Sequence, residues 1–305
     1  MTATASPLHL RLPATSANLG PGFDALGLAM AFYLTIDAVA ADDFHIEARG
    51  RNADLCGDAG NSLILTTYAS VLAANGRPVT PLHLDLDNQI PLGMGCGSSA
   101  AALLAGVLLA DHFGNLGWTD QQILEEACRR EGHPDNVAAC FLGGMTASSE
   151  VEGRVITATC GKNLAWSFFV ALPSASLATE KARALLPPSY SRADAVANVQ
   201  NTALLVSAFA LDRGDLLRTA MRDRIHQPYR MEACPLLPRL LPLAGSRGVL
   251  GVALSGAGPS VLVIAESGAE GSIPGIIREA AADSGLEIIQ TTIAGGVVVQ
   301  KQSTG

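Results

Sequence analysis

Residues 91–104 read Pro91-Leu92-Gly93-Met94-Gly95-Cys96-Gly97-Ser98-Ser99-Ala100-Ala101-Ala102-Leu103-Leu104. Three alternating glycines therefore run straight into an apolar stretch with helical character. Glycine adopts positive φ angles without steric cost, so successive backbone N–H groups can turn toward an anion. The N-terminus of the following helix adds unpaired donors and the positive end of its dipole. This stretch predicts a phosphate-binding loop, in which the two serines either cap the helix or contact a phosphate or its metal ion.

The predicted loop differs from two common nucleotide-binding loops. No Gly-Lys-Ser/Thr follows the glycines, as a Walker A loop requires, and no strand leads directly into a G-x-G-x-x-G fingerprint. Glycines alone would suit a tight strand-to-helix turn equally well. The length of the glycine run and the Ser98–Ser99 pair favour phosphate binding.

Two more glycine-rich segments stand far away in the chain. Residues 13–27 read PATSANLGPGFDALG, where Asn18 and Asp24 are the polar groups of a loop that has few. Taken alone, this segment is an elaborate turn whose Asn and Asp stabilise their own backbone. Residues 252–260 read VALSGAGPS between two expected strands, and Gly256 and Gly258 would let the backbone approach a ligand. Taken alone, that segment is a glycine hairpin.

Composition excludes several classes of protein. The 305 residues are 49% hydrophobic and 16% charged, which is typical of a folded chain with a large core. A formal net charge of −8 makes nucleic acid an unsuitable partner. The apolar run Ala100–Ala110 is too short to cross a membrane, and residues 1–7 do not resemble a secretory signal. Six scattered cysteines without zinc-site spacing fit a reduced, cytoplasmic setting.

The hydrophobic pattern predicts a mixed α+β first half. We expect strands at Leu8–Leu12, Ala31–Val39, Phe44–Ala48, Leu82–Leu86, Gly144–Ser149 and Arg154–Cys160. Helices are expected at Ser62–Ala74 and Ser98–Phe113. A third helix should begin after a capping box at Thr119–Gln122 and end at Glu131, before Gly132.

The second half predicts a strand, helices, two strands, a helix and a last strand. The strands are Trp166–Leu172, Val249–Leu254, Ser260–Ala265 and Leu286–Thr292, and the helices are Glu180–Leu186, Ala193–Arg213, Leu236–Ala244 and Ile273–Ala282. This order is that of a split βαβ, ferredoxin-like domain. We place the boundary near residue 162, with one domain over residues 1–162 and the other over 163–305.

Together the three glycine-rich segments resemble the GHMP kinase superfamily, which phosphorylates small alcohols. That family has, in this order, P-x-x-S-A-N-L-G-P-G-F-D, P-x-G-x-G-L-G-S-S-A and S-G-A-G-P-S, and this chain carries all three. The resemblance implies an N-terminal α+β domain with a left-handed βαβ crossover and a ferredoxin-like C-terminal domain. It also implies ATP as co-substrate and Mg²⁺. The implied nucleotide-binding residues are Pro91, Leu92, Gly93, Met94, Gly95, Cys96, Gly97, Ser98, Ser99, Ala100, Ala101, Gly256 and Gly258.

Three further segments resemble the homoserine kinase family. Residues 131–138 read EGHPDNVA and residues 223–230 read DRIHQPYR, while residues 178–187 match a weaker signature. The resemblance implies that the γ-phosphoryl group of ATP passes to the hydroxyl of L-homoserine, a step of threonine biosynthesis. A kinase for another small alcohol, or a non-catalytic relative that senses ATP and ligand, would be the alternatives. Family members often form homodimers, although no sequence feature here argues for one.

Homoserine is a zwitterion, so its site needs both signs of charge. Arginine forks suit its carboxylate, and the resemblance offers Arg183 and Arg230; either could otherwise be a solvated surface charge. Carboxylate or amide oxygens suit its ammonium group. Candidates for contacts to the substrate are Asn18, Asp24, Asn136 and His133, of which His133 is expected mainly to shape its loop.

The remaining roles follow from the resemblance. Asp135 is the candidate for accepting the hydroxyl proton or for orienting the hydroxyl. Thr179 would either bond the substrate hydroxyl or cap a helix. Ser99 and Glu125 are the implied Mg²⁺ ligands, with the neighbouring Glu126 as a rival for Glu125.

Cys96 departs from the family pattern, which has leucine there. A cysteine before a helix N-terminus is expected to be a reactive thiolate that bound nucleotide protects, unless it is a buried stand-in for leucine.

Overall fold

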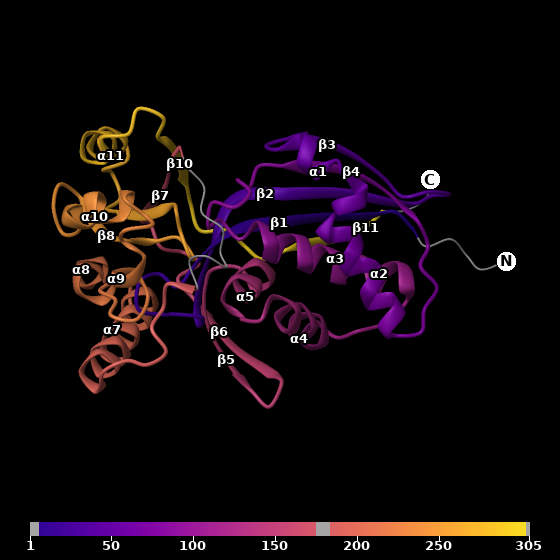
Figure 1. Ribbon diagram of the computed structural model, residues 1–305, viewed down its shortest axis with the longest axis horizontal. Coiled ribbons are helices and arrows are strands. Elements are labelled where there is room, and N and C mark those ends of the chain that lie inside the picture. The colour runs from indigo at the N-terminus through magenta and orange to yellow at the C-terminus, as the bar shows by residue number, and fades with distance from the viewer. Residues whose placement is uncertain (1–5, 175–183, 303–305) are drawn as a thin grey trace.

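The computed structural model describes residues 6–174 and 184–302 and contains two sheets, each with its own helices (Figure 1). The larger sheet runs in the order β11-β1-β2-β4-β3, and β5 pairs with β2 and with β6. Its strands are β1 (Leu8–Ala17), β2 (Leu26–Ala40), β3 (His45–Gly50), β4 (Leu82–Asn88), β5 (Met145–Val151), β6 (Arg154–Cys160) and β11 (Val298–Lys301).

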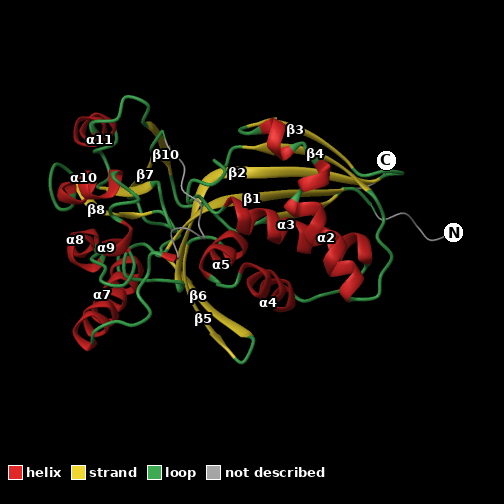
Figure 2. Ribbon diagram, in the orientation of Figure 1, coloured by secondary structure: helices red, strands yellow, loops and turns green. Residues whose placement is uncertain are grey.

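Helices cover one face of this sheet (Figure 2). They are α1 (Ala53–Cys56), α2 (Leu63–Ala74), α3 (Ser98–Gly114), α4 (Asp120–Glu131) and α5 (Asp135–Leu142), with a short 3-10 turn at Ala59–Asn61. The period of two in β4 explains the arrangement: Leu82, Leu84 and Leu86 are fully buried, whereas His83 and Asp85 are half-buried on the other face. Apolar side chains of the strand thus lie against the helical layer.

Two predicted details of this half are confirmed. Thr119 and Gln122 form the capping box of α4, because Thr119 N donates to Gln122 Oε1 (2.9 Å) and Gln122 N donates to Thr119 Oγ1 (3.3 Å). Gly132 ends α4 with a φ of 88°, a left-handed conformation that glycine adopts easily. Strands β3 and β4 are parallel and are joined through α1 and α2, which is a βαβ unit.

The second sheet has the strand order β10-β7-β9-β8, with every pair antiparallel. Numbered within this part of the chain, the order is 4-1-3-2, so the predicted ferredoxin-like arrangement is confirmed. Its strands are β7 (Ser167–Leu172), β8 (Val249–Leu254), β9 (Val261–Ala265) and β10 (Glu287–Thr291). Its helices are α7 (Arg192–Ala210), α8 (Leu217–Ala220), α9 (Gln227–Arg230), α10 (Leu236–Leu240) and α11 (Ile273–Ala281), with 3-10 turns at Gly214–Leu216 and Leu241–Leu243.

The end of the chain returns to the first sheet. Ile293 bridges Met30, and β11 pairs with β1 over four residues. The predicted boundary near residue 162 coincides with the change of sheet between β6 and β7, but it assigned residues 293–301 to the second domain. A four-residue strand is too short for its pattern to be recognised in the sequence. In the described ranges, no helix is both long and apolar enough to cross a membrane.

Candidate active site

The central glycine-rich loop connects β4 to α3. Gly93, Gly95 and Gly97 have φ angles of 69°, 75° and 72°, all in the left-handed region. Gly97 is the N-cap of α3, and because it has no side chain it makes no side-chain capping bond. The alternative that Ser98 or Ser99 caps the helix is therefore not observed. The first N–H groups of a helix have no partner within the helix, so this end of α3 suits an anion.

The three glycine-rich segments meet in space. Thr15 N donates to Cys96 O (3.0 Å), which joins the first segment to the central loop. Asn18 Nδ2 donates to Gly256 O (2.9 Å) and Gly256 N donates to Ala17 O (3.1 Å), which joins the first segment to the third. Segments separated by up to about 240 residues thus form one structure.

Two of these glycines are required because other segments approach them closely. A Cβ on Gly95 would overlap the carbonyl oxygen of Ser255, and a Cβ on Gly97 would overlap the hydroxyl of Thr15. Ser255 Oγ also lies 2.6 Å from the carbonyl oxygen of Gly95. Side chains at these positions would push the segments apart.

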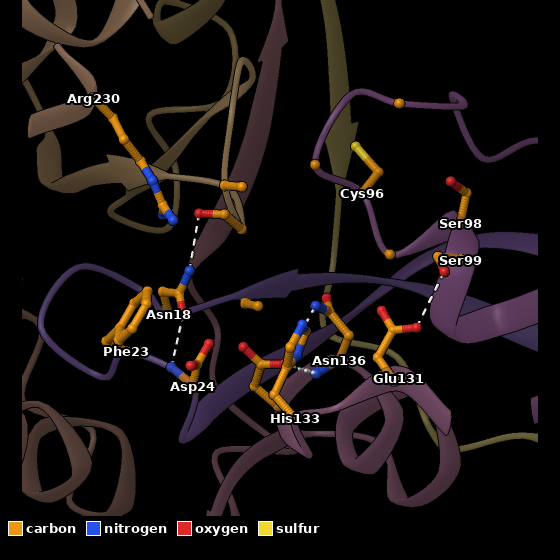
Figure 3. A pocket seen from close by; sticks show the side chains of 17 residues that line it. Asn18, Phe23, Asp24, Cys96, Ser98, Ser99, Glu131, His133, Asn136 and Arg230 are labelled. Atoms are coloured by element: carbon orange, nitrogen blue, oxygen red, sulfur yellow. Dashed lines mark hydrogen bonds and ion pairs between the residues drawn. The ribbon is translucent and has the colours of Figure 1, made fainter. Parts of the chain in front are cut away.

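A cavity opens at this junction, between the two parts of the chain (Figure 3). Most of the predicted site residues line it: Asn18, Asp24, Gly93, Gly95, Cys96, Gly97, Ser98, Ser99, His133, Asp135, Asn136, Arg230 and Gly256. Thr179 and Arg183 lie outside the described residues. Phe23 and Glu131 also line the cavity and were not predicted.

Asp135 is the first residue of α5 and is buried. Its Oδ1 lies 2.6 Å from His133 Nδ1 and accepts a hydrogen bond from Asn136 N (2.7 Å). Thr15 Oγ1 donates to Asn136 Oδ1 (2.8 Å) and so fixes the neighbouring amide. Within the described residues, the hydrogen bonds of the Asp135 carboxylate all involve Oδ1, and Oδ2 is therefore available to a ligand in the cavity.

His133 is the hydrogen-bond partner of the Asp135 carboxylate. Burial by itself lowers the pKa of His133, but the hydrogen bond to Asp135 and its charge outweigh burial, and the net pKa is raised. Asp24, His133 and Asp135 each bring one ligand atom to within 4.8 Å of the others. Asn18 Oδ1 accepts a hydrogen bond from Asp24 N (3.0 Å), so the loop of the first segment positions this carboxylate. The carboxylates of Asp24 and Asp135 thus offer oxygen atoms to a cation.

The predicted metal ligand Glu125 is wrong. It lies away from the cavity, where its Oε1 accepts from Gln121 Nε2 (2.7 Å). The rival, Glu126, bonds to Arg129 and Arg130. Successive residues of a helix differ by about 100°, so Glu125 and Glu131 lie roughly 120° apart around α4 and cannot both face the loop.

Glu131 occupies the place expected for Glu125. Ser99 Oγ donates a hydrogen bond to Glu131 Oε2 (3.1 Å), as Figure 3 shows. Burial raises the pKa of Glu131, against the opposing effects of His133 and Ser99. A hydroxyl and a carboxylate beside a phosphate-binding loop form a donor set that fits Mg²⁺, which prefers oxygen ligands and substrate phosphates.

Arg230 enters the cavity from α9 (Figure 3). Its side chain is 2% exposed, and its Cζ lies 5.6 Å from the centre of the Phe23 ring. The alternative of a solvated surface charge is therefore wrong for Arg230. A buried guanidinium beside an apolar ring suits a planar anion such as a carboxylate.

The predicted reactive thiolate at Cys96 is also wrong. The side chain is 1% exposed, and burial raises the pKa of its thiol to about 12. Desolvation outweighs the opposing effect of the positive charge on Arg51. Cys96 packs in the core in the way that leucine would.

Comparisons with known proteins agree with this geometry. The family model for the N-terminal domain of GHMP kinases matches residues 62–144, and the model for their C-terminal domain matches residues 205–281. A homoserine kinase from Solibacter usitatus is 48% identical over 272 residues, covering 88% of this chain and 89% of the relative. A homoserine kinase from Desulfitobacterium hafniense is 42% identical over 85% of this chain and 88% of its own length. The chain belongs to the homoserine kinase family of GHMP kinases.

Solved structures place this homoserine kinase family member in the same fold. A homoserine kinase from Cytophaga hutchinsonii superimposes with a TM-score of 0.81 at 24% identity, covering 98% of this chain and 99% of the other. A galactokinase from Lactococcus lactis, complexed with galactose, superimposes with a TM-score of 0.65 at 13% identity, covering 96% and 95%. Enzymes with other substrates share this fold. The substrate of this chain must therefore be inferred from the residues of its site.

Proposed function

We propose that this protein transfers the γ-phosphoryl group of ATP to the hydroxyl of L-homoserine, giving ADP and O-phospho-L-homoserine for threonine biosynthesis. The observation that carries this proposal is the pair of opposite charges at one cavity: the guanidinium of Arg230 and the carboxylates of Asp24 and Asp135. A zwitterion satisfies both signs. Galactose has neither charge, and mevalonate has no ammonium group.

The substrate carboxylate binds Arg230, where a desolvated, charge-assisted hydrogen bond is strong. The substrate ammonium lies near Asp24, whose backbone is held by Asn18. Thr179 and Arg183 remain predictions as additional contacts.

ATP binds with its phosphates on the glycine-rich loop and the first turn of α3. Magnesium, held by Ser99 and Glu131, would neutralise charge on the transferred phosphoryl group. Asp135 Oδ2 accepts a hydrogen bond from the substrate hydroxyl, while Asp135 Oδ1 keeps its hydrogen bonds with His133 and Asn136. Asp135 then either accepts the hydroxyl proton or only orients the hydroxyl toward the γ-phosphorus.

The test is to incubate the purified protein with Mg-ATP and L-homoserine and to identify the product by ³¹P NMR and mass spectrometry. A new phosphate monoester of homoserine supports the proposal. ATP consumption without such an ester, or the absence of both, contradicts it.

Arg230→Ala provides a second test, by calorimetry. Loss of the buried partner of a carboxylate typically costs about 2–5 kcal/mol, so homoserine binding should weaken strongly while ATP binding is retained. Unchanged homoserine affinity would remove Arg230 from the substrate site.

We also propose a cytoplasmic location. All six cysteines lie in the described part of the chain and none is in a disulfide, as a reducing compartment favours. Assembly into a homodimer stays a prediction, and the sedimentation coefficient would decide it.

A further inference from the structure

His226 has no predicted role, yet it is in direct contact with the substrate-binding arginine. It precedes Arg230 by one helical turn and is fully buried. Arg230 Nη1 lies 2.9 Å from His226 Nδ1, and His226 Nε2 lies 2.7 Å from the carbonyl oxygen of Gly20. The imidazole therefore stands between the arginine and the first glycine-rich segment.

These two contacts fix the protonation of the ring. Arginine has only donors, so His226 Nδ1 must accept the hydrogen bond from Arg230. A carbonyl oxygen only accepts, so His226 Nε2 must carry a proton and donate it to Gly20. The side chain is thus the neutral imidazole with its proton on Nε2. Burial lowers the pKa of His226, and the charge of Arg230 lowers it further against the opposing effect of Asp223.

The surroundings hold the ring in place. Phe23 stacks on it, with ring centroids 5.2 Å apart and an interplanar angle of 27°. Asp223 Oδ2 accepts hydrogen bonds from the backbone N–H groups of His226 (2.9 Å) and Gln227 (2.6 Å), which fixes the start of α9. Gly20 is itself constrained, because a Cβ there would overlap the carbonyl oxygen of Met221. The ring therefore connects two rigid segments.

The two segments carry opposite ends of the proposed substrate site. Gly20 lies between Asn18 and Asp24, in the loop proposed to face the ammonium group. Arg230 is proposed to face the carboxylate. A rigid link between them sets the distance at which a zwitterion can make both contacts.

We infer that His226 is a positioning residue: its Nδ1 holds the Arg230 guanidinium in the cavity at a fixed distance from the Asn18–Asp24 loop. This inference rests on the proposed function. In this inference, Nδ1 makes the contact that positions Arg230. The contact of Nε2 with Gly20 keeps the ring in the tautomer that leaves Nδ1 as an acceptor. The inference also requires that His226 act on the amino-acid substrate and not on ATP.

Two amide substitutions of His226 distinguish the roles of its two ring nitrogens. The Asn side-chain oxygen stands as many bonds from Cα as Nδ1, and the Gln amide reaches the position of Nε2. His226→Asn keeps the acceptor for Arg230, whereas His226→Gln keeps only the donor to Gly20. His226→Phe keeps the stacking on Phe23 and removes both bonds.

The measurement is kcat/KM for homoserine and KM for ATP. Hydrogen bonds to charged groups correspond to about 10–100-fold in affinity. We expect His226→Gln and His226→Phe to lose that much in kcat/KM for homoserine, His226→Asn to stay close to the parent, and KM for ATP to change in none. His112→Phe is the matched control, because His112 Nε2 makes a bond of the same length, 2.7 Å, to the carbonyl oxygen of Ser6.

A double-mutant cycle completes the test. If His226 acts through Arg230, His226→Gln has no further effect on kcat/KM in the Arg230→Ala background. Equal losses in the Asn and Gln variants, additive losses in the double mutant, or a parallel change in KM for ATP would overturn the inference. A parent protein without homoserine kinase activity would instead refute the proposed function. If His226→Phe does not fold, the Asn and Gln pair still decides.

Discussion

Ser99 Oγ and Glu131 Oε2 lie 3.1 Å apart, although one residue is in the first turn of α3 and the other is the last residue of α4. The contact brings a carboxylate to the helix end that also carries the phosphate-binding loop. Two helices are thereby joined at the point where a magnesium–nucleotide complex would bind.

We expect Glu131→Gln to raise the KM for Mg²⁺ by at least the roughly 10–100-fold typical of residues that support a metal. Glu125→Gln is the matched control and should leave that KM unchanged. Glu125 bonds to Gln121 on a side of α4 that differs from the side of Glu131. Since burial raises the pKa of Glu131, acid should protonate it at a higher pH than an ordinary glutamate. The KM for Mg²⁺ should therefore rise as the pH falls through that pKa, and this dependence should vanish in Glu131→Gln. A larger increase of the KM for Mg²⁺ in Glu125→Gln than in Glu131→Gln would show that Glu125 is the metal ligand.

Asp135→Asn should lower kcat and leave the KM for ATP nearly unchanged. General bases typically contribute about 10²–10⁴-fold, and the amide cannot accept a proton at the position of Oδ2. Steady-state kinetics with circular dichroism would measure this, with Asp111→Asn, on α3 and outside the cavity, as the control. A loss under about tenfold in a folded variant would mean that Asp135 orients the hydroxyl and takes no proton.

Gly97→Ala should destabilise the protein more than Gly93→Ala. Both glycines have positive φ angles, so each substitution costs about 1–2 kcal/mol in backbone strain. Only at Gly97 would the new Cβ also meet another residue, Thr15, and overpacking typically adds about 1–3 kcal/mol. Urea unfolding of the two variants measures the difference. Equal free energies of unfolding would show that the Thr15 contact yields without cost.

Cys96 should not react with a thiol reagent in the folded protein. Its side chain is buried and its thiol has a raised pKa, so little thiolate is available. We expect Cys96→Leu to keep activity and to be inactivated by the reagent at the same rate as the parent. Rapid loss of activity in the parent alone, slowed by Mg-ATP, would show that the loop opens and exposes Cys96.

Sequence patterns predicted the elements whose signals are local. The capping box of α4, the glycine-rich loop and the succession of strands and helices in the ferredoxin-like part each have local sequence signals, and all three are observed. By contrast, β11 has four residues, and its pairing with β1 depends on a strand about 290 residues away. Such pairings leave no local pattern.

The error at Glu125 had a signal that could have corrected it. Leu124, Ala127 and Cys128 form the buried stripe of α4, and the same helical period continues to Glu131. A carboxylate on a buried stripe needs a partner or a metal, so its position alone pointed to the site. The missed role of His226 is different in kind, because its contact with Gly20 joins residues 206 apart and only the fold brings them together.

The central claim is the identity of the phosphoryl acceptor. The most direct measurement is Mg²⁺-dependent ADP formation with L-homoserine, L-serine, galactose and mevalonate at equal concentrations. We predict that kcat/KM for L-homoserine far exceeds that of the other three, because the other amino acid is one methylene shorter and the alcohols lack one or both charges. Equal or faster ADP formation with galactose or mevalonate would contradict the account.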